Sequence, residues 1–299
     1  MTKIVDCITY FDEDMLLDFR LNVLNDYVSK FVIVEAKEDH QGKKKPLNFD
    51  LKNFSKFKDK IIYLVHDRVP DGIREVSSDD NEIAVSEKKI LNAHIRENDQ
   101  RNFIETGLNG ASENDLILVS DVDEIPNLEK NDLREINNKI IMFEQNIFYY
   151  KLNRYLNNFI WFGTKACKKK KLINPQWLRN IKSNNYNLFR LDTFFSKQKY
   201  INKYYIKNGG WHFSNLKNPN DIELKLKSYL HHHDYEVEEL GKNKIKELIK
   251  ENQTIYDMFA DKTANKYGEN SRRKLEKFET NKLPDYIQKN LSTYKDWLD

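Results

Sequence analysis

The stretch Asp115-Leu-Ile-Leu-Val-Ser-Asp-Val-Asp-Glu-Ile-Pro126 decides how the rest of the chain is organised. Its short apolar run, Leu116 to Val119, predicts a buried strand, and the proline at its end is expected to stop the ladder. Asp121, Asp123 and Glu124 therefore follow the carboxyl end of a strand. In an open α/β sheet this is the edge at which ligands bind, so the stretch indicates a binding site.

Asp121 and Asp123 have two interpretations. Two carboxylates with one residue between them can offer oxygens to a hard divalent cation, Mg²⁺ or Mn²⁺, which in turn holds a diphosphate. The same acids could instead cap a helix, expected from Leu128 to Asn137. The continuous apolar strand before the two aspartates, and the α/β pattern before that strand, favour the cation site.

Composition predicts a globular, soluble protein. At 299 residues the chain can bury the core of one large domain or of two closely packed halves. Its net charge of +3, with acids and bases interleaved, does not predict binding to nucleic acid. No signal peptide or run of about 18 apolar residues is apparent. Cys7 and Cys167 match no metal spacing, so we expect a cytoplasmic protein whose thiols stay free.

The first 126 residues have the pattern of a Rossmann-like layered α/β sheet. Apolar runs typical of covered parallel strands occur three times before the acid-tipped one: Lys3 to Tyr10, Lys30 to Glu35 and Ile61 to His66. Two helices are expected between these strands: about Met15 to Asn25 and about Asn81 to Gly107. Right-handed crossovers place the ends of the strands along one edge, so Tyr10, Glu35 and Asp121 should lie there together.

After residue 126 the chain becomes richer in aromatic residues. Three further strands are expected: Ile140 to Leu152, Phe159 to Ala166 and Tyr186 to Leu191. The pair Gly209-Gly210 precedes Trp211 and His212, and its backbone flexibility would let a loop close on a ligand. A helix is expected from Pro219 to Leu230, and the Lys/Glu-rich remainder is predicted to form a C-terminal helical cap.

Three residues are candidates for holding a nucleotide beside Asp121. Tyr10 can stack on a base, Glu35 can accept hydrogen bonds from ribose hydroxyls, and Arg101 could reach the nucleotide from the long helix. His212 could complete a metal shell begun by Asp121 and Asp123, although a lone histidine is as often structural.

An acceptor sugar needs flat rings to lie on and a base to deprotonate it. Trp161 and Trp211 supply amphipathic rings of the type that cover sugar faces, although aromatic residues in strands more often belong to the core. Glu124, Asp192 and Asp234 are the candidate general bases, and their spacing does not rank them firmly. We favour Asp234, because it follows three histidines at a helix end.

The basic run Lys168 to Lys171 also has two interpretations. Most such runs are solvated loops. The run could instead contact an anionic acceptor, or a membrane surface that bears a lipid-linked glycan.

Five motifs follow one another between residues 3 and 236: Ile4-Val-Asp-Cys-Ile-Thr-Tyr-Phe-Asp-Glu-Asp14, Phe31-Val-Ile-Val-Glu-Ala36, Gln100-Arg-Asn102, Ser120-Asp-Val-Asp-Glu-Ile-Pro126 and Gly209-Gly-Trp-His-Phe-Ser214. Together they resemble glycosyltransferase family 17, which contains a β-1,4-N-acetylglucosaminyltransferase. The resemblance implies a GT-A fold, a UDP-sugar donor with UDP-N-acetylglucosamine as the expectation, a divalent cation at Asp121 and Asp123, and inversion at the anomeric carbon. We therefore expect a GT-A domain at 1–236, with a nucleotide-binding half at 1–126 and an acceptor-binding half at 127–236, and a C-terminal helical extension at 237–299.

Two departures from that family matter. Its animal members carry a Golgi membrane anchor and stem that are not seen here, so their N-glycan acceptor need not carry over. The family's Ser-aromatic-x-His-x-Glu pattern is also displaced, because Ser228-Tyr-Leu-His231 is followed by two more histidines, with Asp234 or Glu236 as the acid.

Two competing functions remain. A sugar nucleotidyltransferase would need a glycine-rich phosphate loop after the first strand, where Thr9 to Asp14 contains no glycine. A non-catalytic glycan-binding protein of the same fold would keep the aromatic residues but lose cation-dependent nucleotide binding. We therefore predict an inverting glycosyltransferase that moves a sugar, N-acetylglucosamine, from UDP to a hydroxyl of a saccharide or glycolipid acceptor.

Overall fold

The structure is a computed structural model that describes residues 2–228, 240–256, 258 and 272–299. Its first half contains four parallel strands, at the positions that the apolar runs predict: β1 Ile4–Tyr10, β2 Lys30–Ala36, β3 Ile61–His66 and β4 Leu116–Asp121. They lie in the order β4-β1-β2-β3. Tyr10 is paired with Glu35, and Thr9 with Asp121, so the expected alignment of these strand ends along one edge is confirmed.

The second half of the chain extends the same sheet. Its strands are β5 Glu124–Pro126, β6 Ile140–Tyr149, β7 Arg154–Trp161, β8 Lys165–Lys168, β9 Lys203–Ser214 and β10 Glu276–Lys277. β8 runs antiparallel between β4 and β6 and so joins the two halves, and β9 lies parallel to β6 with β5 against it. The described residues thus form one mixed sheet, in a layered α/β fold.

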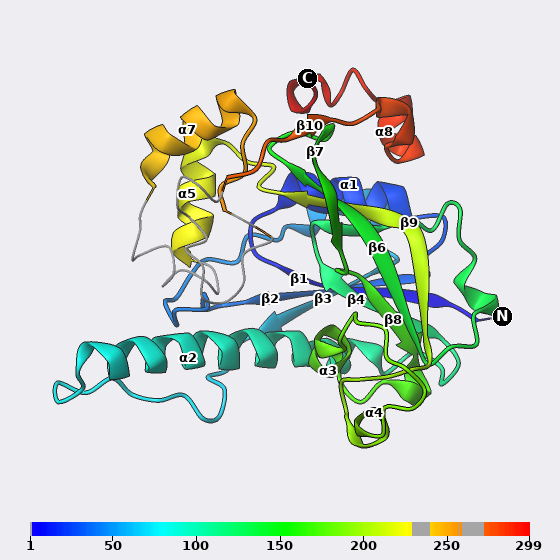
Figure 1. Ribbon diagram of the computed structural model, residues 1–299, viewed down its shortest axis with the longest axis horizontal. Coiled ribbons are helices and arrows are strands. Elements are labelled where there is room, and N and C mark those ends of the chain that lie inside the picture. The colour runs from blue at the N-terminus through cyan, green and yellow to red at the C-terminus, as the bar shows by residue number, and fades with distance from the viewer. Residues whose placement is uncertain (1, 229–239, 257, 259–271) are drawn as a thin grey trace.

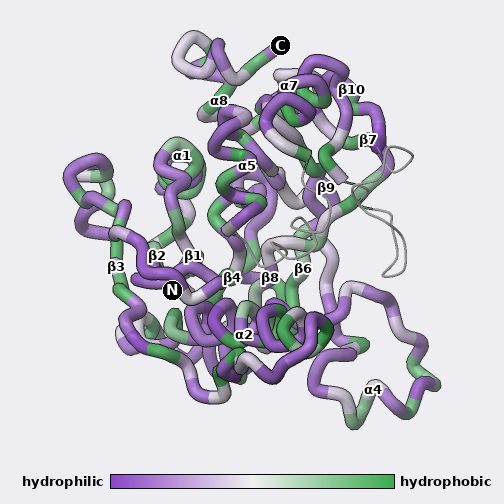
Figure 2. Tube along the Cα trace, turned by 90° about the vertical axis from the view of Figure 1, so that its left-hand side faces the viewer, coloured by the Kyte–Doolittle hydropathy of each residue, from purple (hydrophilic) through white to green (hydrophobic). Residues whose placement is uncertain are grey.

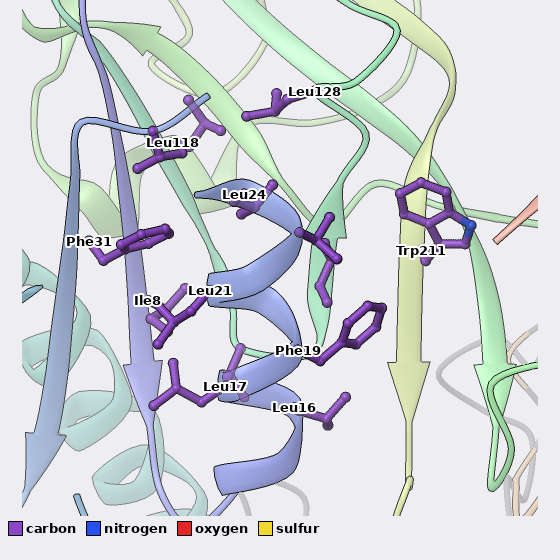
Figure 3. Close-up of a cluster of buried hydrophobic side chains, with 14 of the residues drawn as sticks. Ile8, Leu16, Leu17, Phe19, Leu21, Leu24, Phe31, Leu118, Leu128 and Trp211 are labelled. Carbon is purple, nitrogen blue, oxygen red and sulfur yellow. The ribbon is translucent and has the colours of Figure 1, made fainter. Parts of the chain in front are cut away.

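Side-chain alternation divides the core into two layers. Along β1, Ile4 and Ile8 belong to one buried cluster, whereas Val5 and Cys7 belong to another, because successive side chains of a strand point to opposite faces. Helix α1 (Asp14–Leu24) covers the first face and helix α2 (Glu82–Asn102) runs along the second (Figure 1). Figure 3 shows how Leu17, Leu21 and Leu24 of α1 lie on the first layer.

Smaller helices surround this framework: α3 Pro175–Asn180, α4 Asp192–Phe195, α5 Pro219–Ser228, α7 Gly241–Glu251 and α8 Asp285–Lys289. α5 and α7 pack on each other over the upper end of β6, through Ile222, Ile245 and Ile147. None of the described helices has the length and apolar character that a membrane crossing requires.

Four expectations about individual elements are wrong. Residues 128–137 form no α-helix but only a short 3₁₀ turn, Leu133–Glu135. The proline at 126 does not stop the pairing, because β5 pairs with β9 alone and a proline is tolerated in such an edge segment. Residues 186–191 form an irregular loop before α4, and the glycine pair lies inside β9 instead of in a loop.

The C-terminal part departs from a purely helical cap. Its helices α7 and α8 are present, but β10 between them pairs with β7 and returns the chain to the sheet. Leu283, Ile287 and Tyr294 then join the main core cluster. Both cysteines are buried and free, which was the expectation for Cys7.

Candidate active site

The carboxyl ends of β1, β2 and β4 surround a cavity of about 90 Å³. Asp121 and Asp123 both line it, together with Tyr10 and Arg101. A second cavity of about 410 Å³ adjoins it, since both are lined by Glu38, His40, Lys45 and Gln100, among others. Three of the four residues that the sequence suggests for a nucleotide, Tyr10, Arg101 and Asp121, thus meet in one place.

The Asp121 carboxylate is held between two arginines. Arg101 of α2 lies 3.0 Å from its Oδ1, and Arg179 of α3 lies 2.9 Å from its Oδ2. Burial by itself would raise the pKa of Asp121, but Arg179 and Arg101 outweigh it and hold the pKa below its ordinary value. Asp121 is therefore ionised at neutral pH.

The Asp123 carboxylate has two looser cationic neighbours. His212 Nε2 lies 3.6 Å from its Oδ1 and Lys225 Nζ lies 3.5 Å from its Oδ2. Burial would raise the pKa of Asp123, yet His212 and Lys225 lower it well below its usual range. Conversely, burial would lower the pKa of His212, but Asp123 raises it. Strand pairing makes this contact possible, because β9 places His212 directly opposite Glu124.

Glu124 is fully buried and its two carboxylate oxygens are occupied. Trp161 donates its Nε1 hydrogen to Oε1 over 2.6 Å, and Arg179 bonds to Oε2 over 2.8 Å and to Oε1 over 3.0 Å. The backbone N–H of Asp121 also donates to Oε2. A general base must have a lone pair aimed at the acceptor hydroxyl, and these four hydrogen bonds already use the oxygens of Glu124. Its arrangement instead positions Asp121, Trp161 and Arg179.

Glu35, the expected ribose ligand, is buried and does not line the cavity. Its side chain is fully buried and accepts hydrogen bonds from Lys45 Nζ, Tyr63 Oη and the backbone N–H groups of Asn48 and Phe49. These partners satisfy both oxygens. The carboxylates that do line the cavity on this side are those of Glu38 and Asp39, just past the end of β2.

The two tryptophans lie in different surroundings. Trp211 is buried among the side chains of the main core (Figure 3), and its Nε1 donates to the carbonyl of Lys282. Trp161 lines two open cavities of about 580 and 460 Å³ that also contain Arg179 and Lys165. Of the two candidate acceptor platforms, Trp161 is thus the one connected to the site, because it donates to Glu124 and shares its cavities with Arg179, the partner of Asp121.

The remaining candidate bases lie away from the cavity or outside the description. Asp192 is on the exposed α4, where Arg190 and Lys199 lower its pKa to about 2. It does not line the cavity that contains Asp121. Asp234 lies outside the described residues.

The lysine run is far from the acidic edge. Lys168 pairs with Leu116, at the opposite end of β4 from Asp121. Lys169 Nζ donates to the carbonyl of Ala111, and Lys170 Nζ to Asn114 Oδ1. Any partner of this run would meet the opposite edge of the sheet.

The donor atoms of Asp121 and Asp123 suit a hard divalent cation. Both side chains are ionised and face one cavity. The contacts of Asp123, at 3.5 and 3.6 Å, are looser than those of Asp121, whose two oxygens are held by Arg101 and Arg179, so a bound cation would have to take the place of at least one arginine contact at Asp121. Within the described part of the chain no group of three or more His, Cys, Asp or Glu side chains is placed to hold a metal ion. The residues therefore fit a site of two carboxylates that a substrate diphosphate would complete, without His212 as a preformed third ligand.

Three residues that contact the acids of the site or hold their backbone were not predicted from the sequence. Arg179 and Lys225 come from distant helices, and nothing local marks either of them. Arg20 of α1 carries a signal that could have been used. It shares the apolar face of its helix with Leu17, Leu21 and Leu24, and a charge at such a position must find a buried partner.

In open α/β sheets, ligands bind at the carboxyl ends of the parallel strands, which is where Asp121 and Asp123 lie in this structure. The chain belongs to glycosyltransferase family 17, whose family model matches residues 1–298, and it is therefore a glycosyltransferase. No curated protein matches it.

Similar solved structures share only 11–12% of their residues with this chain. A putative glucose-1-phosphate thymidylyltransferase from Bacillus anthracis, in complex with a sucrose, aligns over 71% of this chain and 88% of its own at 12% identity, with a TM-score of 0.34. HddC from Yersinia pseudotuberculosis aligns over 70% and 92% at 12% identity, with a TM-score of 0.32. The inositol-1-phosphate CTP transferase from T. maritima aligns over 76% and 97% at 11% identity, also with a TM-score of 0.32. Likeness at this level carries no functional argument.

Proposed function

We propose that this glycosyltransferase moves N-acetylglucosamine from a UDP donor to a saccharide hydroxyl, with inversion at the anomeric carbon and with a divalent cation, Mn²⁺ or Mg²⁺, bound at Asp121 and Asp123. One observation supports the proposal most. The two ionised aspartates line the same cavity, at the edge where nucleotides bind in α/β sheets. Family membership favours sugar transfer over nucleotidyl transfer and over non-catalytic glycan binding.

In this proposal Asp121 and Asp123 would hold the cation, and the chemistry that it would supply is neutralisation of the charge that builds up on the departing diphosphate. Arg101, Arg179 and Lys225 surround the same two carboxylates and add positive potential where the diphosphate would lie. Tyr10 and Arg101 form the wall on the nucleotide side. Inversion requires a base on the opposite side of the sugar from the leaving group, and Asp234 stays our candidate for that role.

The cation site is tested by titrating UDP into the protein with and without MnCl₂ in a calorimeter. The wild type should bind UDP more tightly with manganese, and Asp123→Asn should lose that gain while keeping its circular dichroism spectrum. Asp192→Asn is the matched control, because it removes an exposed acid that does not line the cavity. If Asp123→Asn keeps the full effect of manganese, the metal role of Asp123 is wrong.

Turnover tests the donor and the base. A panel of UDP-sugars is assayed for release of UDP with a set of saccharide acceptors, and UDP-N-acetylglucosamine should be used best. Asp123→Ala should lower the rate by about 100-fold or more, because charge on the leaving group is no longer neutralised. Asp234→Asn should lower the rate without changing UDP affinity. Fast turnover by Asp234→Asn would assign the base elsewhere.

A further inference from the structure

The loop between α3 and β9 exposes an unusual amount of apolar surface. Within residues 184–199, which we call the apolar loop, five large apolar side chains are more than two-thirds exposed: Leu188, Phe189, Leu191, Phe194 and Phe195. Phe189 and Phe195 are 89% and 91% exposed. Figure 2 shows that this loop, with α4 in it, projects from the body of the molecule. Clustered exposed apolar side chains of this kind mark an interaction surface.

The base of the apolar loop is firmly tied to the fold. The N–H of Lys182 donates to the carbonyl of Gln198 over 2.9 Å, which closes the loop. Trp177 Nε1 donates to the carbonyl of Lys197 over 2.6 Å, and Tyr205 Oη donates to that of Ser183 over 2.7 Å. These hydrogen bonds hold the two ends of the apolar loop against the fold, so the exposed side chains project from an anchored loop.

The charges on and beside the apolar loop are mostly positive. Lys182, Arg190, Lys197 and Lys199 accompany the apolar residues, whereas Asp192 is the single acid between them. Asp192 is shared by Arg190 and Lys199. Aromatic and aliphatic side chains flanked by lysine and arginine are the composition of segments that lie in the interface of an anionic membrane.

We propose that the apolar loop docks the protein on an anionic lipid bilayer, with Leu188, Phe189, Phe194 and Phe195 inserted among the lipid headgroups. A bilayer explains the charges better than a second copy of the chain does. In a symmetric dimer the same patch meets itself, so the cations of the loop would face one another.

Docking would also bring a membrane-borne acceptor to the catalytic edge. Lys182, Ser183 and Gln198 at the base of the loop line the cavity of about 580 Å³ that contains Trp161 and Arg179. Arg179 in turn bonds to Asp121. This consequence rests on the proposed function, and it makes a lipid-linked saccharide the class of acceptor.

Docking is tested by sedimenting the protein with vesicles of equimolar phosphatidylcholine and phosphatidylglycerol. The wild type should bind them, bind pure phosphatidylcholine vesicles more weakly, and lose affinity as salt is added. The double variant Phe189→Ser, Phe195→Ser should bind about tenfold more weakly or worse, because two large side chains no longer enter the bilayer. Ile83→Ser is the matched control, since Ile83 is a large apolar residue of α2 that is 71% exposed.

Three results would overturn the docking proposal. The first is equal vesicle binding by the wild type and the double variant. The second is wild-type self-association in analytical ultracentrifugation that the double variant loses, without vesicle binding by either. The third is vesicle binding that Lys170→Glu abolishes and the double variant retains, which would assign the contact to the lysine run. UDP titration separates this proposal from the proposed function, because the double variant should bind UDP and manganese as the wild type does.

Discussion

At the scale of single residues, Arg20 shows how the turn that carries Asp121 and Asp123 is held in place. Its guanidinium is fully buried and bonds to both carboxylate oxygens of Asp6, over 2.6 and 2.7 Å. It also donates to the backbone carbonyls of Asp121 and Glu124, at 3.2 and 2.7 Å. One side chain of α1 thus fixes the main chain on both sides of Asp123, and the geometry of the candidate metal site depends on it.

Arg20→Met should lower the free energy of unfolding by about 3–5 kcal/mol, because it leaves Asp6 as an uncompensated buried charge. Urea unfolding measures this loss. The double variant Arg20→Met, Asp6→Asn should lose less free energy of unfolding than the two single variants do together, since the two side chains share one interaction. Arg134→Met, which breaks the exposed pair with Asp132, should change stability little. A loss for Arg20→Met as small as that for Arg134→Met would contradict the prediction.

The sequence identified the two acids of the site and one cationic neighbour of each, Arg101 and His212, but not the other neighbours, Arg179 and Lys225. Asp121 and Asp123 could be placed because they follow a continuous apolar strand, and strand ends define the binding edge. Arg179 lies 58 positions after Asp121 and Lys225 lies 102 positions after Asp123, so only the tertiary fold brings these pairs together. Glu35 was misplaced for a related reason, because its four donors come from the chain after β2 and turn it inward.

At the scale of elements, the pairing of β5 with β9 is what brings His212 to Asp123. The two strands approach closely where Pro126 faces Gly210, whose φ is +144°. A Cβ on Gly210 would lie 2.1 Å from the carbonyl oxygen of Ile125. Both the backbone conformation and the contact therefore require glycine at this position.

Gly210→Ala should lower the free energy of unfolding by at least about 1–3 kcal/mol, the cost of forcing such a conformation on an L residue. It should also weaken manganese-dependent UDP binding, because β9 can no longer hold His212 beside Asp123. Gly110→Ala is the control, since a Cβ there meets no atom within 4 Å. If Gly210→Ala leaves both the urea unfolding curve and the titration of UDP unchanged, glycine is not required where β5 pairs with β9.

Elements were predicted well where one physical signal dominated. The parallel strands are continuous apolar runs, and α2 lies in a long stretch without glycine or proline. The α-helix ends at Asn102, and a 3₁₀ helix from Phe103 to Leu108 carries the chain past Gly107, where the helix was expected to end. In residues 128–137, Leu128 and Leu133 are buried in the main core cluster and Ile136 packs against it, but only Leu133–Glu135 has helical geometry, so apolar content alone did not predict the turn. Residues 186–191 have the aromatic and aliphatic content of a strand, but Leu188, Phe189 and Leu191 are exposed and pair with no neighbour strand in the described sheet.

At the scale of the whole molecule, the C-terminal segment is built into the main core. Ile287 of α8 is fully buried in the same cluster as Leu17 of α1. The rings of Tyr294 and Phe19 lie 6.1 Å apart, and Arg154 bonds to the carboxylate of Asp299 at 2.7 Å. Composition showed a Lys/Glu-rich stretch at 237–299 and suggested an appended extension, because side-chain packing between distant segments leaves no mark on local composition.

Because this segment shares the core, Ile287→Ala should lower the stability of the whole protein by about 2–5 kcal/mol, and Leu17→Ala should do the same, since each leaves a cavity in one cluster. Both variants should shift a single urea transition, followed by tryptophan fluorescence and by circular dichroism, to lower urea. Leu291→Ala is the control, since Leu291 follows α8 but is 38% exposed and should shift the transition little. If the segment were only appended, Ile287→Ala would produce a separate unfolding transition at low urea. The main transition would stay where it is in the wild type, and Leu17→Ala would still shift it. That outcome would separate residues 276–299 from the catalytic fold, and a single shared transition would make them part of it.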